Sequence, residues 1–588
     1  MAEQSIKFET GSAASTTSPS DKGSLHSRLN SGGNKNMNKN RNGNGNGNVE
    51  AFASKGELGG GGSYQSGKKG DGNLHQQISL LRRLPEKDDL DEIMSAPLFT
   101  YSILRNAERL ATDASKNPFS QYALLAGDSD ILRQTPTEDP RIFYNVTSPS
   151  SMFICGSQGS GKSHSLSCVL ENCMIPAPIL GRLPKPLTGI VFHYDTFISD
   201  SGGVPCEAAY LSTDPRVSVR VLCPPTNATT IKDTYSSLKN VKVEELRLKE
   251  SYLNTKRMLE LMAFGDRNQP LYMHVIQRIL RDMRIEQQKT RSGFKYNDFV
   301  RELKNEKLMP DQMRPLQQRL DTLESFMVPE QIGLGAQISP ANSKSQKRMN
   351  YKINSSGTNW TPRSGELIIV DLSCPCITPS MACSLFNICL AIFLEQKTPL
   401  GRVIALDEAH KYMGETVECE TLTNNLLSVI RLQRHLGARV VISTQEPTIS
   451  PKLLDLCSVT VVHRFTSPEW LKVLTKHLAG ISMASKVDRR IEDVDQDAAR
   501  RDGANNASSL HDIVVSSSDP IVELFSHIVK LKTGEALVFA PSAIIDFEKQ
   551  KSQAQKIEST QKRLAHRIMR VVIRARITMD GGRSIMAN

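Results

Sequence analysis

The chain has 588 residues, of which 39% are hydrophobic, and this is enough for a substantial core and for more than one domain. Its eleven cysteines are scattered and contain no paired Cys-x-x-Cys motif, which argues against a disulfide or zinc framework and favours a reducing intracellular compartment, the cytoplasm or the nucleus. No signal peptide is evident, and the longest apolar stretch, Met381 to Leu394, is shorter than the roughly 20 residues that span a bilayer, so we expect no membrane association.

The net charge of +11 arises at the two ends of the chain. Residues 1–75 carry nine Lys and Arg against six Asp and Glu, and residues 549–588 carry ten against two, so the middle is close to neutral. Basic ends are expected where a terminus contacts a polyanion, and equally where solvated tails keep a protein soluble. The charge distribution leaves both interpretations open.

The first 148 residues precede any strong motif. Residues 1–75 are rich in Gly, Asn and Ser, and this composition buries too little apolar surface to offset chain entropy, so we predict a disordered tail. Residues 76–148 mix short amphipathic fragments with proline-punctuated stretches, and we expect them to wrap onto the core.

A phosphate-binding loop is predicted at residues 156–163. The string Gly156-Ser-Gln-Gly-Ser-Gly-Lys-Ser163 matches the G-x-x-x-x-G-K-[ST] pattern, with an apolar run before it and a helical pattern after it. In such a loop the backbone N–H groups converge on phosphate oxygens, next to the positive end of the helix. Lys162 would reach the outer phosphates, and the Ser163 hydroxyl would bind Mg²⁺. The predicted nucleotide-binding residues are Gly156, Ser157, Gln158, Gly159, Ser160, Gly161, Lys162, Ser163 and His164.

Residues 149–229 are predicted to form the first part of an α/β core, with further strands at 187–195 and 217–222. From 230 to 332, long charged stretches carry apolar residues at helical spacing, which predicts an all-helical insertion. Residues 333–363 are rich in Gly, Ser, Asn and Lys, and we expect an exposed loop there.

The alternation of strands and helices resumes over residues 364–548, with a mobile excursion predicted at 485–519. The apolar run 403–406 ends in Asp407 and Glu408, as in a central parallel strand that delivers two carboxylates to its carboxyl end. Asp407 would hold Mg²⁺, and Glu408 would polarise the attacking water as a general base. Together with the phosphate loop, this pair predicts an enzyme that hydrolyses ATP with Mg²⁺.

The predicted fold class is α/β, with a mostly parallel sheet covered on both faces. A basic extension follows at 549–588, and its apolar residues Ile557, Leu564, Ile568 and Val572 have helical spacing. This helix would carry Lys562, Arg563, Arg567, Arg570 and Arg574 on its other face. It could follow a phosphate backbone with salt-dependent affinity, or it could be a surface helix that closes the subunit.

Several strings combine in one pattern: residues 156–163, Val370-Asp-Leu-Ser373, Asp407-Glu-Ala-His410, Arg434-His-Leu-Gly437, Val441-Ile-Ser-Thr-Gln-Glu-Pro447 and Thr533 to Pro541. This pattern resembles the HerA/FtsK superfamily of hexameric DNA-pumping ATPases, particularly its HerA-like branch, which implies a RecA-like core. The resemblance covers roughly 150–240 and 364–545. A DEAH-box helicase fits less well because 245 residues separate Lys162 from Asp407, and no Leu-Ser-Gly-Gly-Gln string indicates an ABC-type ATPase.

The resemblance implies further site residues. Gln445 matches a polar sensor of the γ-phosphate or its water, and Arg434 matches an arginine finger that reaches a neighbouring subunit's site, with Arg431 as its rival. Asp195 lies where the family often has an acidic residue near the metal, although it departs from the usual Asp-Pro pattern. His410 is more readily a supporting group than a catalyst. The predicted catalytic residues are thus Lys162, Glu408, Arg434 and Gln445.

An arginine that acts in trans requires abutting protomers, so the resemblance implies a homo-oligomeric ring, specifically a hexamer. Such a ring would use ATP to translocate or remodel DNA, bound without sequence specificity. The alternative is a nucleotide-gated scaffold, or a protein-remodelling ATPase whose helical insertion engages a protein partner. The N-terminal β-barrel usual in HerA proteins is not evident in residues 1–148.

Overall fold

The structure, a computed structural model, describes residues 93–110, 119–133, 138–196, 202–262, 271–332, 357–477, 520–551 and 557–581. The tail predicted at 1–75, the excursion predicted at 485–519 and most of the loop predicted at 333–363 lie outside these residues. Within the described ranges, no helix combines the length and the apolar character needed to cross a membrane.

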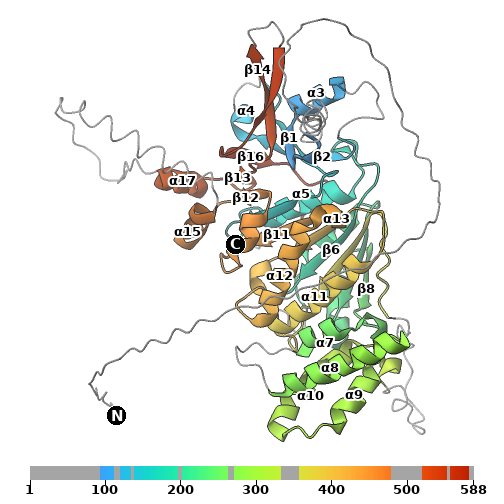
Figure 1. The fold of residues 1–588 in the computed structure, drawn as a ribbon. Helices are drawn as coiled ribbons and strands as arrows, with labels where there is room; N and C mark the ends of the chain where they lie inside the picture. The colour runs from blue at the N-terminus through green and yellow to red at the C-terminus, as the bar shows by residue number, and fades with distance from the viewer. Residues whose placement is uncertain are drawn as a thin grey trace, which may run out of the picture. The chain divides into compact units, whose positions relative to one another are not determined.

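One half of the central sheet consists of parallel strands (Figure 1). In sheet order they are β12 (Val459–Val462), β4 (Ser151–Cys155), β11 (Ala438–Thr444), β10 (Arg402–Leu406), β6 (Thr188–His193), β9 (Glu366–Asp371), β7 (Ser218–Cys223) and β8 (Val241–Glu245). The strands from β12 to β9 are buried at every position, which explains why their sequences are nearly continuous apolar runs. The prediction of an α/β fold around a mostly parallel sheet is confirmed.

The other half of the sheet is antiparallel apart from one pair, and it combines segments from both ends of the described chain. After β12 the sheet order is β13 (Glu535–Phe539), β16 (Met569–Ile573), β2 (Tyr122–Asp128), β3 (Arg141–Asn145), β1 (Leu98–Thr100), β14 (Ile544–Lys551) and β15 (Ile557–Arg563). The short β5 (Gly181–Arg182) pairs with β2. The segment predicted to wrap onto the core therefore supplies three strands, together with α3 (Tyr101–Leu110) and α4 (Ser129–Arg133).

The prediction of a C-terminal helix up to about residue 572 is wrong, because β15 and β16 occupy this part of the chain. In β16, Met569, Val571 and Ile573 are buried while the two residues between them are less so, which is the period of two that a strand requires. The apolar residues also matched a helical period, but pairing with β13 and β2 determines the conformation here.

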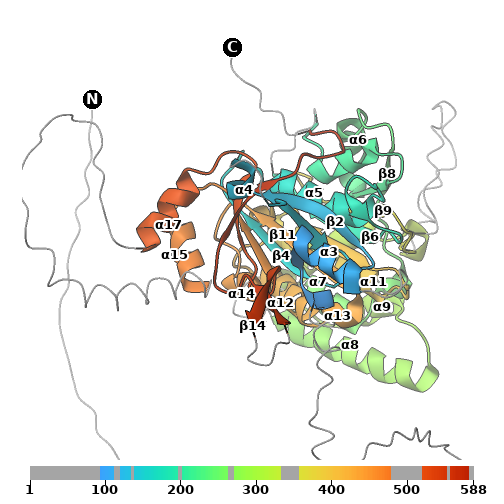
Figure 2. The same ribbon diagram turned by 90° about the horizontal axis from the view of Figure 1, so that it is seen from above.

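Helices cover both faces of the parallel strands (Figure 2). α5 (Lys162–Met174) packs on one face, in a core that includes Val403 and Ala405 of β10. α11 (Pro379–Glu395) and α12 (Val417–Arg431) pack on the other face, in a core that includes Ile404 and Leu406 of the same strand. Because successive side chains of a strand point to opposite faces, β10 separates the two cores.

The insertion consists of α7 (Thr255–Met262), α8 (Leu271–Thr290), α9 (Tyr296–Asn305) and α10 (Pro310–Phe326), drawn in green in Figure 1. Its predicted start at residue 230 is too early, because α6 (Ala228–Thr234) is followed by β8, which is an edge strand of the main sheet. The predicted exposed loop is also wrong at its end, where Thr358 and Trp360 are buried. Further α-helices are α13 (Gln433–Leu436), α14 (Pro451–Leu456), α15 (Pro468–His477) and α17 (Pro520–Val529).

Candidate active site

The two predicted motifs meet at one edge of the parallel sheet. β4 ends at Cys155, directly before the glycine loop, and β10 ends at Leu406, directly before the acidic pair. β11 lies between these strands and ends at Thr444. Because parallel strands have their carboxyl ends at the same edge, the fold brings together four of the predicted residues, namely Lys162, Asp407, Glu408 and Gln445.

Two glycines of the loop combine a positive φ with a close neighbour. Gly161 directly precedes α5 with φ +110°, and a Cβ there would lie 3.2 Å from the backbone nitrogen of Gly534. Gly156 has φ +154°, and a Cβ there would lie 2.7 Å from both the His463 Cβ and the Ser160 Oγ. Glycine thus lets the loop pack closely against the neighbouring segments while it turns into the helix. The first N–H groups of α5 have no earlier helical carbonyl to bind, so they are donors for an anion.

Lys162 is a buried cation at the start of α5, with only 3% of its surface exposed. Its Nζ donates a hydrogen bond to the Ser157 carbonyl at 2.9 Å, and it makes no ion pair within the described ranges. Burial lowers the pKa of Lys162, and the nearby negative charges of Glu408 and Asp407 oppose this effect. A buried ammonium group without a bound counter-charge is costly, so this position favours an anionic ligand.

Asp407 is buried, and its two carboxylate oxygens have different surroundings. Oδ2 lies 3.2 Å from His193 Nδ1, whereas Oδ1 is buried without a hydrogen-bond partner in the described part of the chain. Burial by itself raises the pKa of Asp407, but the hydrogen bond and the charge of His193 outweigh it and bring the pKa below its ordinary value. Asp407 is therefore an anion at neutral pH and has one oxygen left for a further ligand.

Glu408 has a left-handed backbone, with φ +47°, which is uncommon for a residue with a side chain. Its Oε2 accepts a hydrogen bond from Gln445 Nε2 at 2.5 Å, and the Gln445 backbone carbonyl accepts one from Trp470 Nε1 at 2.8 Å. Burial and the charge of Asp407 raise the pKa of Glu408. A carboxylate with a raised pKa, held in one orientation, is suited to accept a proton.

His410 supports this arrangement as a neutral group. Its Nδ1 lies 3.5 Å from the Glu408 carboxylate, which could suggest an ion pair. However, the same nitrogen accepts a hydrogen bond from the Gln445 backbone N–H at 3.4 Å, and burial lowers the pKa of His410 to about 4. The neutral imidazole therefore positions the turn around Glu408 and Gln445.

The sequence reasoning missed His193, Cys206 and His463. His463 follows β12, and its ring nitrogens lie 2.8 Å from Ser165 Oγ in α5 and 2.9 Å from the Glu535 carbonyl in β13. It thereby fixes the start of α5 to the sheet beside the loop. Its only sequence signal is a polar residue at the end of an apolar run, and the same holds for His193 at the end of β6.

Asp195 was the acidic residue predicted near the metal at this strand end, but His193 is the residue of this segment that contacts Asp407. Asp195 instead forms an ion pair of 3.1 Å with Lys411. The His164 side chain also has another partner, because its Nε2 lies 2.8 Å from the Arg574 carbonyl. Both side chains thus have partners outside the group of Lys162, Asp407, Glu408 and Gln445.

Arg434 and Arg431 do not belong to this cluster. Arg434 lies in α13 and Arg431 at the end of α12, and both are exposed. Both precede the first residue of β11, Ala438, so they lie at the amino end of a strand whose carboxyl end carries Gln445. Within one chain, the fold keeps these arginines away from Lys162 and Glu408.

No protein-family model matches the chain, and no curated protein matches it significantly in sequence. Among solved structures, it is similar to VirB4 of Thermoanaerobacter pseudethanolicus, with a TM-score of 0.38 and 11% sequence identity. The similarity covers 78% of this chain and 97% of the VirB4 chain.

Proposed function

We propose that this chain is an ATPase whose active site lies at the carboxyl edge of β4, β11 and β10. The observation that carries the proposal is the parallel pairing of β4, β11 and β10, which brings the buried Lys162 at the start of α5 to the same sheet edge as Asp407 and Glu408. A glycine-rich turn, a buried lysine and two carboxylates at one strand edge are the groups that bind and hydrolyse a nucleoside triphosphate.

The residues present suit Mg²⁺. Asp407 has a buried carboxylate oxygen without a partner among the described residues, and Ser163 follows Lys162 in the first turn of α5 with a half-buried side chain. Carboxylate and hydroxyl oxygens are donors that Mg²⁺ prefers, so Asp407 and Ser163 would hold it. When bound, Mg²⁺ neutralises charge on the outer phosphates.

The other side chains have separate roles in hydrolysis. Lys162 binds the outer phosphate oxygens and stabilises the negative charge that develops on them. Glu408 orients the attacking water and accepts its proton at the carboxylate, and Gln445 holds that carboxylate in place through its side-chain amide. The burial of Lys162 and Asp407 strengthens these electrostatic interactions.

The test is steady-state ATP hydrolysis by the full chain and by a Lys162→Ala variant. We expect Mg²⁺-dependent turnover that falls at least about 100-fold in the variant, since a charge-stabilising donor contributes about 10²–10³. The exposed Lys476 of α15, changed to Ala, is a control that should leave turnover unchanged. Turnover that is equal in the wild type and the Lys162 variant would contradict the proposal.

We further propose that the ATPase is an intracellular homo-oligomeric ring, with the hexamer expected from the resemblance, that moves or remodels DNA. The position of Arg434 supports a ring, because an exposed arginine away from its own site is available to a neighbour's site. The C-terminal segment supports DNA binding less than expected, since Arg570 and Arg574 form ion pairs with Glu535 and Glu171. Turnover with single- and double-stranded DNA, together with the mass of the particle with and without ATP, tests this proposal. Turnover that DNA leaves unchanged, or a monomeric mass with ATP, would contradict it.

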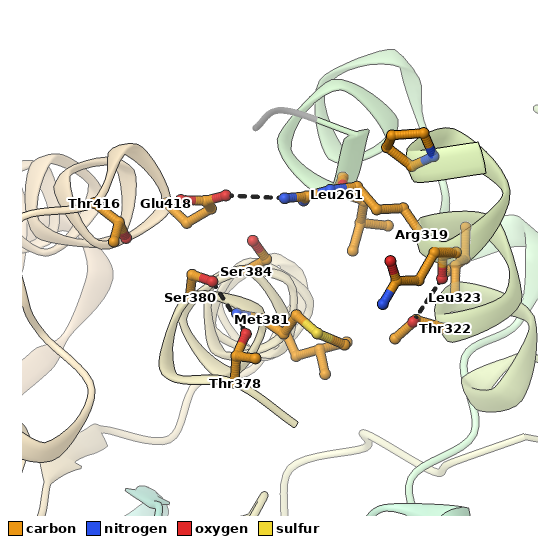
Figure 3. A pocket seen from close by; sticks show the side chains of 13 residues that line it. Leu261, Arg319, Thr322, Leu323, Thr378, Ser380, Met381, Ser384, Thr416 and Glu418 are labelled. Carbon is orange, nitrogen blue, oxygen red and sulfur yellow. Dashed lines mark hydrogen bonds and ion pairs between the residues drawn. The ribbon is translucent and has the colours of Figure 1, made fainter. Parts of the chain in front are cut away.

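A second candidate function, nucleotide-gated engagement of a protein partner, is supported by a contact between the insertion and α12. Arg319 of α10 lies 3.3 Å from the buried carboxylate of Glu418 in the first turn of α12. Figure 3 marks this ion pair with a dashed line. A cavity of about 420 Å³ lies beside this pair, and its lining includes Met381 of α11. α12 begins nine residues after Glu408, and in this candidate function a change around Glu408 would reach the insertion through α12 and the Glu418–Arg319 pair.

Hydrogen exchange separates this candidate from the first. If nucleotide gates the insertion, ATP should change the exchange protection of α10 in a Glu408→Gln variant, and turnover should respond to a protein partner but remain unaffected by DNA. Stimulation by DNA with no change in the insertion would favour the DNA-moving function.

A further inference from the structure

Three buried side chains of different chemistry lie close together at the acidic pair, and one of them is Asp407 itself. His193 ends β6, Cys206 precedes the turn Glu207–Thr213, and Asp407 follows β10. Their exposed fractions are 6%, 0% and 3%. One nitrogen, one sulfur and one oxygen atom of this triad all lie within 4.8 Å of one another, and the described part of the chain holds no second group of this kind.

The spacing of the triad suits a tetrahedral metal ion. His193 Nδ1 and Asp407 Oδ2 are 3.2 Å apart, and Cys206 Sγ and Asp407 Oδ2 are 3.6 Å apart. A tetrahedral Zn²⁺ with its usual bond lengths separates a nitrogen from an oxygen ligand by about 3.3 Å and a sulfur from an oxygen ligand by about 3.5 Å. Two of the three separations thus match those around a shared ion, and the third, between the His193 and Cys206 atoms, is within 4.8 Å.

A hydrogen bond fixes the backbone position of Cys206, and strand pairing fixes that of His193. The Cys206 backbone N–H donates to the Tyr235 hydroxyl at 3.0 Å, and that hydroxyl donates to Asp371 Oδ2 at 2.7 Å. Asp371 ends β9 and pairs in register with His193 of β6. Partners beyond the donor atoms that fix their orientation are typical of protein metal sites.

The donor set also indicates the kind of ion. A thiolate and an imidazole with one carboxylate favour a thiophilic or borderline cation such as Zn²⁺, whereas Mg²⁺ and Ca²⁺ prefer oxygen ligands. Coordination would replace the proton on the Cys206 thiol and require a neutral His193 ring, so the displaced protons go to solvent.

We propose that His193, Cys206 and Asp407 bind one thiophilic divalent cation of the Zn²⁺ class. Binding itself does not depend on the proposed ATPase function. One consequence does: the cation occupies Oδ2 of the carboxylate that would hold Mg²⁺, so micromolar Zn²⁺ lowers ATP turnover through the triad.

Cobalt is the probe for the binding experiment, because Co²⁺ takes Zn²⁺ sites and is coloured. The full chain, freed of metal with a chelator, is titrated with Co²⁺. We expect a thiolate-to-cobalt absorption band in the near ultraviolet that saturates at one ion per chain and disappears on addition of Zn²⁺. A Cys206→Ser variant should lose the band and bind Co²⁺ more than about 100-fold more weakly. The control is Cys389→Ser, an equally buried cysteine of α11, which should keep the band.

The proposal is overturned if the wild type shows no thiolate band, or if Cys206→Ser binds Co²⁺ like the wild type. If Cys206→Ser does not fold, X-ray absorption of the wild-type Co²⁺ complex decides, since the site requires one sulfur neighbour at about 2.3 Å. The consequence for turnover is tested separately, where Zn²⁺ should inhibit the wild type and Cys389→Ser but not Cys206→Ser. If no form hydrolyses ATP, the proposed function fails while the cobalt spectrum still decides the metal site.

Discussion

The side-chain amide of Gln445 donates a hydrogen bond of 2.5 Å to Glu408 Oε2, which links the end of β11 to the turn that follows β10. Local structure orients each of the two residues. Glu408 has a left-handed backbone that turns its side chain away from the direction of the strand, and Trp470 holds the carbonyl of Gln445. The carboxylate is thus oriented before any substrate binds, which is what a general base requires.

Replacing Glu408 with Gln keeps the shape of the side chain and removes its ability to accept a proton. We expect ATP to bind with nearly unchanged affinity and turnover to fall at least about 100-fold, since general-base catalysis contributes about 10²–10⁴. Titration with a fluorescent ATP analogue and steady-state hydrolysis measure the two quantities. Glu415→Gln, at an exposed position in the same segment, is the control and should keep full turnover. A Glu408 variant that retains turnover would rule out this role.

The Gln445→Ala variant tests the hydrogen bond through the pH dependence. Burial and the charge of Asp407 raise the pKa of Glu408, and the bond from Gln445 lowers it, so the pKa of Glu408 should rise when Gln445 is removed. Because a base works only when it is deprotonated, the acidic limb of the pH–rate profile should move to higher pH. The exposed neighbour Glu446, changed to Ala, should leave the limb in place. If the acidic limb of the pH–rate profile does not move in Gln445→Ala, the pKa of another group determines its position.

His463 should make stability depend on pH. Burial lowers the pKa of His463 to about 4 from an ordinary value of 6.5. Between these pH values the unfolded chain binds a proton that the folded chain does not, so the free energy of unfolding falls as the pH falls. The contribution of neutral His463 to the free energy of unfolding is fully present above pH 6.5. It is lost towards pH 4 and amounts to about 3 kcal/mol in total.

Urea unfolding of the wild type and of His463→Asn at pH 7.5 and pH 5 measures this effect. The loss of stability between the two pH values should be about 2 kcal/mol smaller in the variant. His527→Asn, on an exposed position of α17, is the control and should lose as much as the wild type. Equal losses in wild type and His463→Asn would show that His463 is not buried in its neutral form.

The sequence predicted those site residues that can be recognised from a single strand and the motif that follows it. A buried parallel strand is an apolar run, and the polar residue after it lies at the carboxyl edge, so Lys162 and Asp407 could be placed together without a structure. Gln445 was expected beside them only from the resemblance to the HerA/FtsK superfamily. His193 was not predicted as a partner of Asp407, because no motif marks the end of β6 and only the pairing of β6 with β10 brings the two side chains together. The prediction for the C-terminal segment failed for a similar reason. Its apolar spacing fits both a helical and a strand period, and only the pairing of β16 with β13 decides between them.

Arg434 can act in catalysis only on another subunit, because it lies at the amino end of β11 and Lys162 lies at the opposite edge of the sheet. We expect Arg434→Ala to keep its ATP affinity and to lose about 10³-fold in turnover, the effect of a missing arginine finger. An equal mixture of Arg434→Ala and Lys162→Ala subunits should then recover activity, because about a quarter of the interfaces join an intact arginine to an intact lysine. Arg431→Ala, treated in the same way, decides between the two arginines, since only the true finger shows recovery on mixing. If neither mixture recovers activity although the subunits exchange, the arginine does not act between subunits and the site is complete within one chain.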